Sequence, residues 1–166
     1  MRPSVRVTAC LSALLVLANC AATPPAEAPA QTEVSGPSTK ASRANIDDIA
    51  CLAEAVYFEA RGTSDKGQKA VAHVVLNRAS SPKFPNSVCG VISDKCQFSY
   101  KCDGRPDVLA HSGDRQRAID LARQVLSGAA SDITEGALFF HAASMEPGWF
   151  NTRPRVGAFG GNIFYR

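Results

Sequence analysis

The sequence carries little net charge, few aromatic residues and no C-x-x-C pair. Its 18 basic and 15 acidic side chains leave a formal charge of +3, which is too small to indicate a protein that binds nucleic acid. Aromatic residues make up 7% of the chain, whereas hydrophobic residues make up 45%, enough apolar material for one core. This composition excludes a disordered or fibrous chain, and 166 residues allow one domain of ordinary size rather than two large ones.

An apolar run near the N-terminus, Val7 to Ala18, is short for a membrane span and follows two arginines, as in a secretory signal. It leads into L-A-N-C, which resembles a bacterial lipobox in which Cys20 becomes the lipid-bearing first residue, although Asn19 departs from the usual small residue. The alternative is ordinary cleavage near Ala22. We predict that residues 1–20 are an export signal of lipoprotein type. The protein would then lie in the periplasm of the cell envelope, anchored to the outer membrane only through its lipid.

A composition change separates this signal from the rest of the chain. Residues 21–44 are rich in Pro, Ala, Ser and Thr and contain no aromatic residue, so they cannot bury enough apolar surface to offset their ordering entropy. We predict a disordered linker there. All 8 Phe, 3 Tyr and the single Trp lie at or after Tyr57, so one folded domain is expected over residues 45–166.

Two of the six cysteines fall in the signal segment, and four remain for the domain: Cys51, Cys89, Cys96 and Cys102. An even number in an oxidising compartment favours two disulfides, and the sequence leaves three pairings open. We favour Cys89–Cys96 with Cys51–Cys102, which would close one local and one long loop. The alternative is a zinc site that adds His111 or His141. The absence of a C-x-x-C pair disfavours it, and no metal is expected.

Hydrophobic periodicity predicts an α+β fold in which helices dominate. The predicted helices cover residues 46–60, 65–78 and 114–126, and the predicted strands cover residues 137–142 and 162–165. Asn45 is the predicted N-cap of the first helix, and Gly62 is its stop. Residues 80–113 are too long for an ordinary structureless loop, so we expect them to be functional or ordered by disulfides.

Two glutamates of the first predicted helix fall on different sides of it. At ~100° per residue, Glu59 flanks the apolar stripe, whereas Glu54 falls on the opposite, solvated side. Partial burial disfavours the charged form of a carboxyl group and raises its pKa, which a general acid needs in order to hold its proton near neutral pH. The alternative is that Glu59 reaches past the helix edge or pairs with Arg61.

Four segments together carry a family resemblance. They are CLAEAVYFEARGTSDKGQKAVAHVVLNR from Cys51, CQFSYKCDGRPD from Cys96, ALFFHAASMEPGW from Ala137 and the terminal FGGNIFYR. In this order they resemble the signature of the spore-cortex-lytic, SleB-like cell wall hydrolase family. The resemblance implies a mostly helical, lysozyme-like catalytic domain with a small antiparallel sheet. It also implies cleavage of peptidoglycan between N-acetylmuramic acid and N-acetylglucosamine, usually by lytic transglycosylation that leaves a 1,6-anhydro end. The family's catalytic acid is the glutamate of E-A-R-G, here Glu59.

This chemistry needs only one carboxyl group. Ordinary glycosidases use two carboxylates, an acid and a base or nucleophile. Glu59 would instead protonate the leaving glycosidic oxygen and then, as a carboxylate, remove the proton from the muramic 6-hydroxyl, which attacks C1 of its own sugar. No cofactor is expected. Asp103 and Asp107 are the candidates for a second carboxylate, although Asp103-Gly104 is first a turn signal.

Polar and aromatic side chains in the matching segments are candidates for substrate binding. The candidates are Tyr57, Gln97, Phe98, Ser99, His141, Trp149 and Asn162. Amide and hydroxyl groups would bind the N-acetyl and hydroxyl groups of the sugars, Phe98 or Trp149 would lie against a sugar face, and Tyr57 would hydrogen-bond Glu59. The alternatives are structural: packing of the loop at 97–99, a structural His141 and a core position for Trp149.

Two positions depart from the family pattern. Thr63 stands where the family often has a second glutamate, from which we expect only a local effect. Asn162 stands where the terminal motif often has histidine. An amide donates and accepts hydrogen bonds but carries no proton charge, so substrate contact is the better hypothesis for Asn162.

Three functions compete on the sequence. The first is a peptidoglycan lytic transglycosylase or muramidase that acts as a monomer on the glycan strands. The second is a module that binds peptidoglycan without cutting it, and the third is a disulfide-stabilised structural lipoprotein of the envelope. Glu59 is essential only under the first of these hypotheses.

Overall fold

The computed structural model describes residues 39–166, and their side chains from residue 45 onward. The predicted signal, its Cys20 and residues 21–38 of the predicted linker lie outside these residues. The elements in chain order are α1 (Thr39–Ala60), α2 (Asp65–Ala79), α3 (Val88–Ile92), η1 (Ser99–Cys102), α4 (Ser112–Leu126), β1 (Phe139–Ala142), η2 (Phe150–Thr152), β2 (Arg155–Phe159) and β3 (Asn162–Tyr165). Within this part of the chain, no helix has both the length and the apolar character needed to cross a bilayer.

Helix α1 is longer than the periodicity predicts. It begins at Thr39 rather than at residue 46, so Asn45 lies inside the helix and the prediction that it is the N-cap is wrong. Residues 39–44 contain no Pro or Gly and include Lys, Ala and Arg, which favour helix, so the helix continues through them. The predicted stop is confirmed, because Gly62 follows the helix with a φ of +79°.

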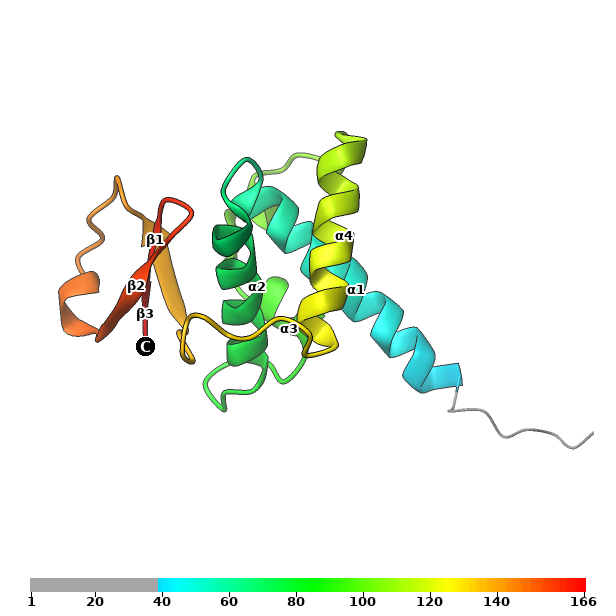
Figure 1. The fold of residues 1–166 in the computed structure, drawn as a ribbon, viewed down its shortest axis with the longest axis horizontal. Helices are drawn as coiled ribbons and strands as arrows, with labels where there is room; N and C mark the ends of the chain where they lie inside the picture. Colours follow the sequence, from blue (N-terminus) through cyan, green and yellow to red (C-terminus); the bar gives the residue numbers. More distant parts are fainter. Residues whose placement is uncertain (1–38) are drawn as a thin grey trace, which may run out of the picture. The chain divides into compact units, whose positions relative to one another are not determined.

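Helix α2 lies at the centre of the fold, between the sheet and the pair α1 and α4 (Figure 1). Its predicted range, 65–78, is confirmed to within one residue, and the Ser64 side chain caps its N-terminus by accepting a hydrogen bond from the Gly67 amide. Ala72 and Val75 pack into the helical core, whereas Val71 and its neighbours pack against the sheet. A helix that is apolar on more than one face belongs in an interior, and α2 therefore joins the two cores.

The sheet is small and antiparallel, in the order β1–β3–β2. Strands β1 and β3 lie within the predicted ranges, and β2, which the sequence did not predict, pairs with β3. Gly160 and Gly161 join β2 to β3 with φ values of +58° and +82°, the geometry of a tight hairpin turn. A Cβ atom at Gly67 of α2 would lie 2.5 Å from the Gly160 Cα, so only glycine allows this hairpin to approach α2 so closely.

The loop that leads into β1 is fixed to α2 by a side-chain network. The Asn77 amide donates to the Asp132 carboxylate at 3.0 Å and to the Ala137 carbonyl at 3.2 Å. Asp132 also accepts from the Thr134 amide at 2.8 Å. Burial raises the pKa of Asp132, but the hydrogen bonds from Thr134, Asn77 and Gly136 outweigh it and lower the pKa overall. The network holds the loop before β1 against α2.

The four cysteines form two disulfides, as predicted, but the pairing that we favoured is wrong. Cys51 pairs with Cys89, and Cys96 pairs with Cys102. Packing of α3 against α1 brings the Cα atoms of Cys51 and Cys89 within 5.3 Å, and a tight turn brings those of Cys96 and Cys102 within 5.6 Å. Both bonds order the segment 80–113, which also contains α3 and η1. Loop lengths of 38 and 6 residues correspond to about 4 and about 2 kcal/mol of stabilisation.

Candidate active site

A cleft of about 450 Å³ lies beside the end of α1. It is lined by Glu59, Arg78, Gln97, Ser99, Phe140, His141, Ala142, Met145, Pro147, Trp149 and Asn162. The structure thus brings Glu59 together with five of the residues predicted to bind substrate, although they come from distant parts of the chain. Strand pairing places Ala142 of β1 opposite Asn162 of β3, and this edge of the sheet faces the end of α1 across the cleft.

Glu59 lies in the last turn of α1 and is partly buried. Burial raises the pKa of its carboxyl group, and the positive charge of Arg78 lowers it by a smaller amount, so the net direction is upward. The neighbouring Arg61 turns away and donates to the Tyr57 hydroxyl at 2.8 Å, so the alternative Glu59–Arg61 pair does not form. A carboxyl group with a raised pKa in an open cleft suits general acid catalysis.

Arg78 is the feature of the cleft that the sequence did not reveal. Its side chain is 5% exposed, and its Nε donates to the Leu138 carbonyl at 2.8 Å. Its Nη1 is buried with no hydrogen-bond acceptor among the described residues. Burial lowers the pKa of the guanidinium to about 10, while Glu59 and Asp94 raise it, so it stays charged at neutral pH. A buried cationic donor without an acceptor is costly, and a substrate oxygen in the cleft would satisfy it.

The guanidinium of Arg78 is held by aromatic rings. It lies 5.2 Å from the ring centroid of Phe84 and 5.7 Å from that of Phe98. Arg78 was not among the residues that the sequence predicted to bind substrate. The N-R pair that ends the first matching segment was the signal that could have identified it.

Glu54 and the two candidate aspartates lie away from the cleft lining. The prediction that Glu54 is solvated is wrong, because its side chain is only 23% exposed and forms an ion pair with Lys101. Lys101 also pairs with Asp107 at 2.9 Å. Asp103 accepts from the Arg105 amide at 2.9 Å within a turn, as the Asp-Gly signal indicated. Neither aspartate contributes a second carboxylate to the cleft.

Two of the residues predicted to bind substrate are in the core instead. Tyr57 is 3% exposed, and its hydroxyl is occupied by Arg61 and by the His111 amide at 3.1 Å. Phe98 is 1% exposed and packs beneath Arg78. Neither lines the cleft, so neither is placed to bind substrate there, and the Tyr57 hydroxyl bonds Arg61 and His111 rather than Glu59 as predicted. In the Q-F-S run the flanking polar residues face outward, and the phenylalanine between them anchors the loop.

His141 forms a fixed wall of the cleft. Its Nδ1 lies 2.8 Å from the Ala142 carbonyl, which can only accept, so the neutral ring carries its proton on Nδ1. Its Nε2 then accepts from the Tyr165 hydroxyl at 3.0 Å, and the two rings stack. With both nitrogens hydrogen-bonded, the His141 ring is held in place as part of the cleft wall.

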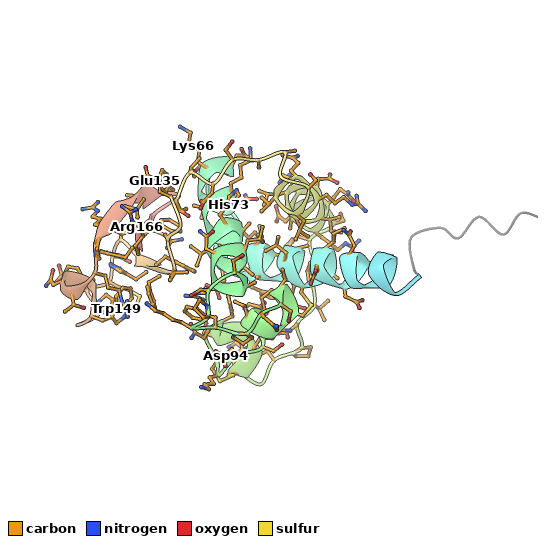
Figure 2. The ribbon with its side chains drawn as sticks, turned by 90° about the horizontal axis from the view of Figure 1, so that it is seen from below. Lys66, His73, Asp94, Glu135, Trp149 and Arg166 are labelled. Carbon is orange, nitrogen blue, oxygen red and sulfur yellow. A yellow bond between two sulfur atoms is a disulfide. The ribbon has the colours of Figure 1, made fainter. Side chains whose placement is uncertain are left out.

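Trp149 and Asn162 complete the sheet side of the cleft. Trp149 is partly buried among the strands and η2 (Figure 2), where it meets the His141 ring edge-on at 5.6 Å. It packs against the sheet and also lines the cleft, so its contact with a sugar remains a prediction. Asn162 is 9% exposed and lies at the start of β3.

Comparison with known proteins identifies relatives of this chain. The family described as Cell Wall Hydrolase matches residues 62–165, a segment that begins just after Glu59. The spore cortex-lytic enzyme of Bacillus subtilis is 39% identical over 119 residues, and that of Halalkalibacterium halodurans is 38% identical; the matches cover 71% of this chain. They span only 37% and 34% of those relatives.

Solved structures give the same relationship. The catalytic domain of the germination-specific lytic transglycosylase SleB from Bacillus anthracis superposes with a TM-score of 0.59 at 34% identity, covering 80% of this chain and 98% of that one. These findings confirm the α+β, mostly helical, lysozyme-like architecture with a small antiparallel sheet. This chain belongs to the cell wall hydrolase family.

Proposed function

We propose that this chain cleaves the glycan strands of peptidoglycan between N-acetylmuramic acid and N-acetylglucosamine by lytic transglycosylation. The observation that carries the proposal is the cleft itself, in which Glu59 is the sole carboxylate among the described lining residues. A two-carboxylate mechanism needs a second carboxylate that faces the scissile bond, and no other carboxylate is among the residues that line this cleft. With one carboxyl group, the route that uses the same residue as acid and then as base is favoured. The lytic transglycosylase named among the solved relatives supports this choice.

The proposed reaction has two proton transfers. Glu59 gives its proton to the glycosidic oxygen as the bond from that oxygen to C1 of the muramic acid breaks. The resulting carboxylate then takes the proton of the 6-hydroxyl while O6 bonds to C1, which closes the 1,6-anhydro ring and returns Glu59 to its acid form. No water is consumed. The raised pKa of Glu59 favours the first transfer, and the nearby charge of Arg78 stabilises the carboxylate between the two transfers.

The remaining lining residues position the sugars in this proposal. Gln97, Ser99 and Asn162 offer amide and hydroxyl groups to the N-acetyl and hydroxyl groups of the glycan. Trp149 and the rigid His141 form the apolar wall on the sheet side. Holding the 6-hydroxyl against C1 makes the second step intramolecular, which supplies much of the reduction in the barrier.

The nature of the product tests the proposal. Purified sacculi are digested by the protein in ¹⁸O-labelled water, and the soluble muropeptides are analysed by mass spectrometry. We expect 1,6-anhydro-muramic ends without ¹⁸O. Reducing ends that carry ¹⁸O would show hydrolysis instead, and unchanged sacculi would favour a binding or structural protein.

We also propose that the protein works in the cell envelope, tethered by a lipid on Cys20 and with residues 21–38 as part of the tether. The lipobox-like L-A-N-C run supports this proposal. A palmitate analogue fed to cells should label the full chain and fail to label the Cys20→Ala variant. Equal labelling of both chains would refute lipidation at Cys20.

A further inference from the structure

A second cavity, of about 340 Å³, adjoins the cleft. The two hollows share His141 and Met145 in their linings, so His141 forms the wall between them. The ring is held on both sides by the Ala142 carbonyl and the Tyr165 hydroxyl, so this wall is rigid. The second cavity is therefore a preformed neighbour of the cleft and takes no part in the proton transfers assigned to Glu59.

The charges of this cavity are unpaired. Arg153 and Arg155 line it, with Glu146 as the single acid. Neither arginine forms an ion pair with any residue that the structure describes. Two guanidinium groups against one carboxylate leave the cavity with an excess of positive charge, which suits an anionic ligand.

Arg153 is also pre-organised. Its guanidinium carbon lies 3.5 Å from the ring centroid of Phe139 and 5.8 Å from that of Trp149, which also lines the cleft. Its Nε is buried and has no hydrogen-bond acceptor within residues 45–166. A buried donor that lacks an acceptor is destabilising, and a ligand oxygen that reached it would remove this cost. Arginine offers parallel N–H donors that match a carboxylate in a bidentate pair.

We propose that this cavity binds a carboxylate on the lactyl–peptide arm of the muramic acid held in the cleft. The inference rests on the proposed function, because muramic acid, unlike N-acetylglucosamine, carries such an arm at its 3-position. When the muramic C1 of a bound strand lies at Glu59, this arm projects away from the glycan axis, and the second cavity adjoins the cleft at that sugar. Arg153 and Arg155 then select strands whose arms still carry free carboxylates.

The test compares three forms of the same sacculi. One is native, one has its carboxyl groups amidated with ammonia and a carbodiimide, and one has had its peptides removed by an amidase. On native sacculi we expect Arg155→Gln to lower kcat/KM about fivefold, mostly through KM, as for loss of one partly exposed charge pair. Arg155 is exposed, so the variant should fold. Arg115→Gln, an exposed arginine on α4, is the matched control and should cleave like the wild type.

Amidation supplies the measurement that is independent of protein folding. It should slow the wild type by the same factor and leave Arg155→Gln no slower than before. The amidase frees the lactyl carboxylate, which is an amide in native sacculi. On the stripped strands, an advantage of the wild type over Arg155→Gln therefore shows that the cavity also binds the lactyl carboxylate, and its loss restricts the contact to carboxylates of the peptide. A wild type that cleaves native and amidated sacculi equally well would overturn the subsite alone. A wild type that cleaves none of the three would overturn the proposed function and the subsite with it.

Discussion

The Glu59→Gln variant is expected to lose glycan cleavage by about 10³-fold while it remains folded. Glutamine keeps the shape and hydrogen-bonding capacity of the protonated carboxyl group but cannot give up a proton. The cleft contains no other described carboxylate that could take over the role. The rate at which dye-labelled fragments are released from sacculi measures the loss, and circular dichroism checks the fold.

The same substitution should not destabilise the protein. Because burial raises the folded-state pKa of Glu59, the wild type loses stability as the pH rises from the ordinary value of that carboxyl group through the raised one. Glutamine removes this penalty, so the free energy of unfolding of the variant should exceed that of the wild type by about 0.5–1 kcal/mol at neutral pH. The difference should disappear at acidic pH, where the wild-type carboxyl is neutral in both states.

Glu54→Gln is the matched control for this prediction. Glu54 lies on the same helix but pairs with Lys101 outside the cleft lining. We expect it to keep its activity and to lose about 1 kcal/mol of stability at most. If Glu54→Gln lost as much activity as Glu59→Gln, the assignment of the acid to Glu59 would be wrong.

Arg78→Gln is expected to lower kcat/KM about tenfold to a hundredfold. This loss corresponds to one hydrogen bond from a buried cationic donor to a substrate oxygen. It should also move the alkaline limb of the pH–rate profile to higher pH. The Arg78 charge lowers the pKa of Glu59, so its loss lets Glu59 keep its proton longer as the pH rises. The pH dependence of kcat/KM measures both effects together.

Arg78→Lys separates the charge from the geometry. Lysine keeps the positive charge but cannot reproduce the planar contacts with Phe84 and Phe98 or the full set of donors. We expect a reduced rate with an alkaline limb close to that of the wild type. If the alkaline limb of Arg78→Gln also stayed at the wild-type pH, Arg78 would have only a structural role.

Periodicity predicted the parts of the fold that depend on local sequence. The helical spacing of apolar residues located α2 and α4 to within two residues, because both helices have a clear apolar stripe and well-defined ends. The start of α1 was missed, since residues 39–44 contribute no apolar stripe and follow a segment rich in Pro and Ala. Strand β2 was missed although Gly160-Gly161 is a hairpin signal, because Gly157 interrupts its apolar pattern.

The burial of individual side chains and the pairing of the cysteines cannot be predicted from a single sequence. The helical wheel placed Glu59 beside apolar surface, but it could not show that Phe98 would turn inward while Gln97 and Ser99 turn outward. The position of Arg78 in the cleft depends on the residue just before β1, which is distant in the chain and whose carbonyl, that of Leu138, accepts a hydrogen bond from Arg78. The disulfide pairing likewise depends on how α3 packs against α1, which spacing alone does not encode.

The most direct test of the central claim, that one carboxyl group performs both proton transfers, is muropeptide mass spectrometry on sacculi digested by the wild type and by Glu59→Gln in parallel. The account predicts 1,6-anhydro-muramic ends from the wild type and no new ends from a folded Glu59→Gln variant. New ends of either kind from that variant would contradict it.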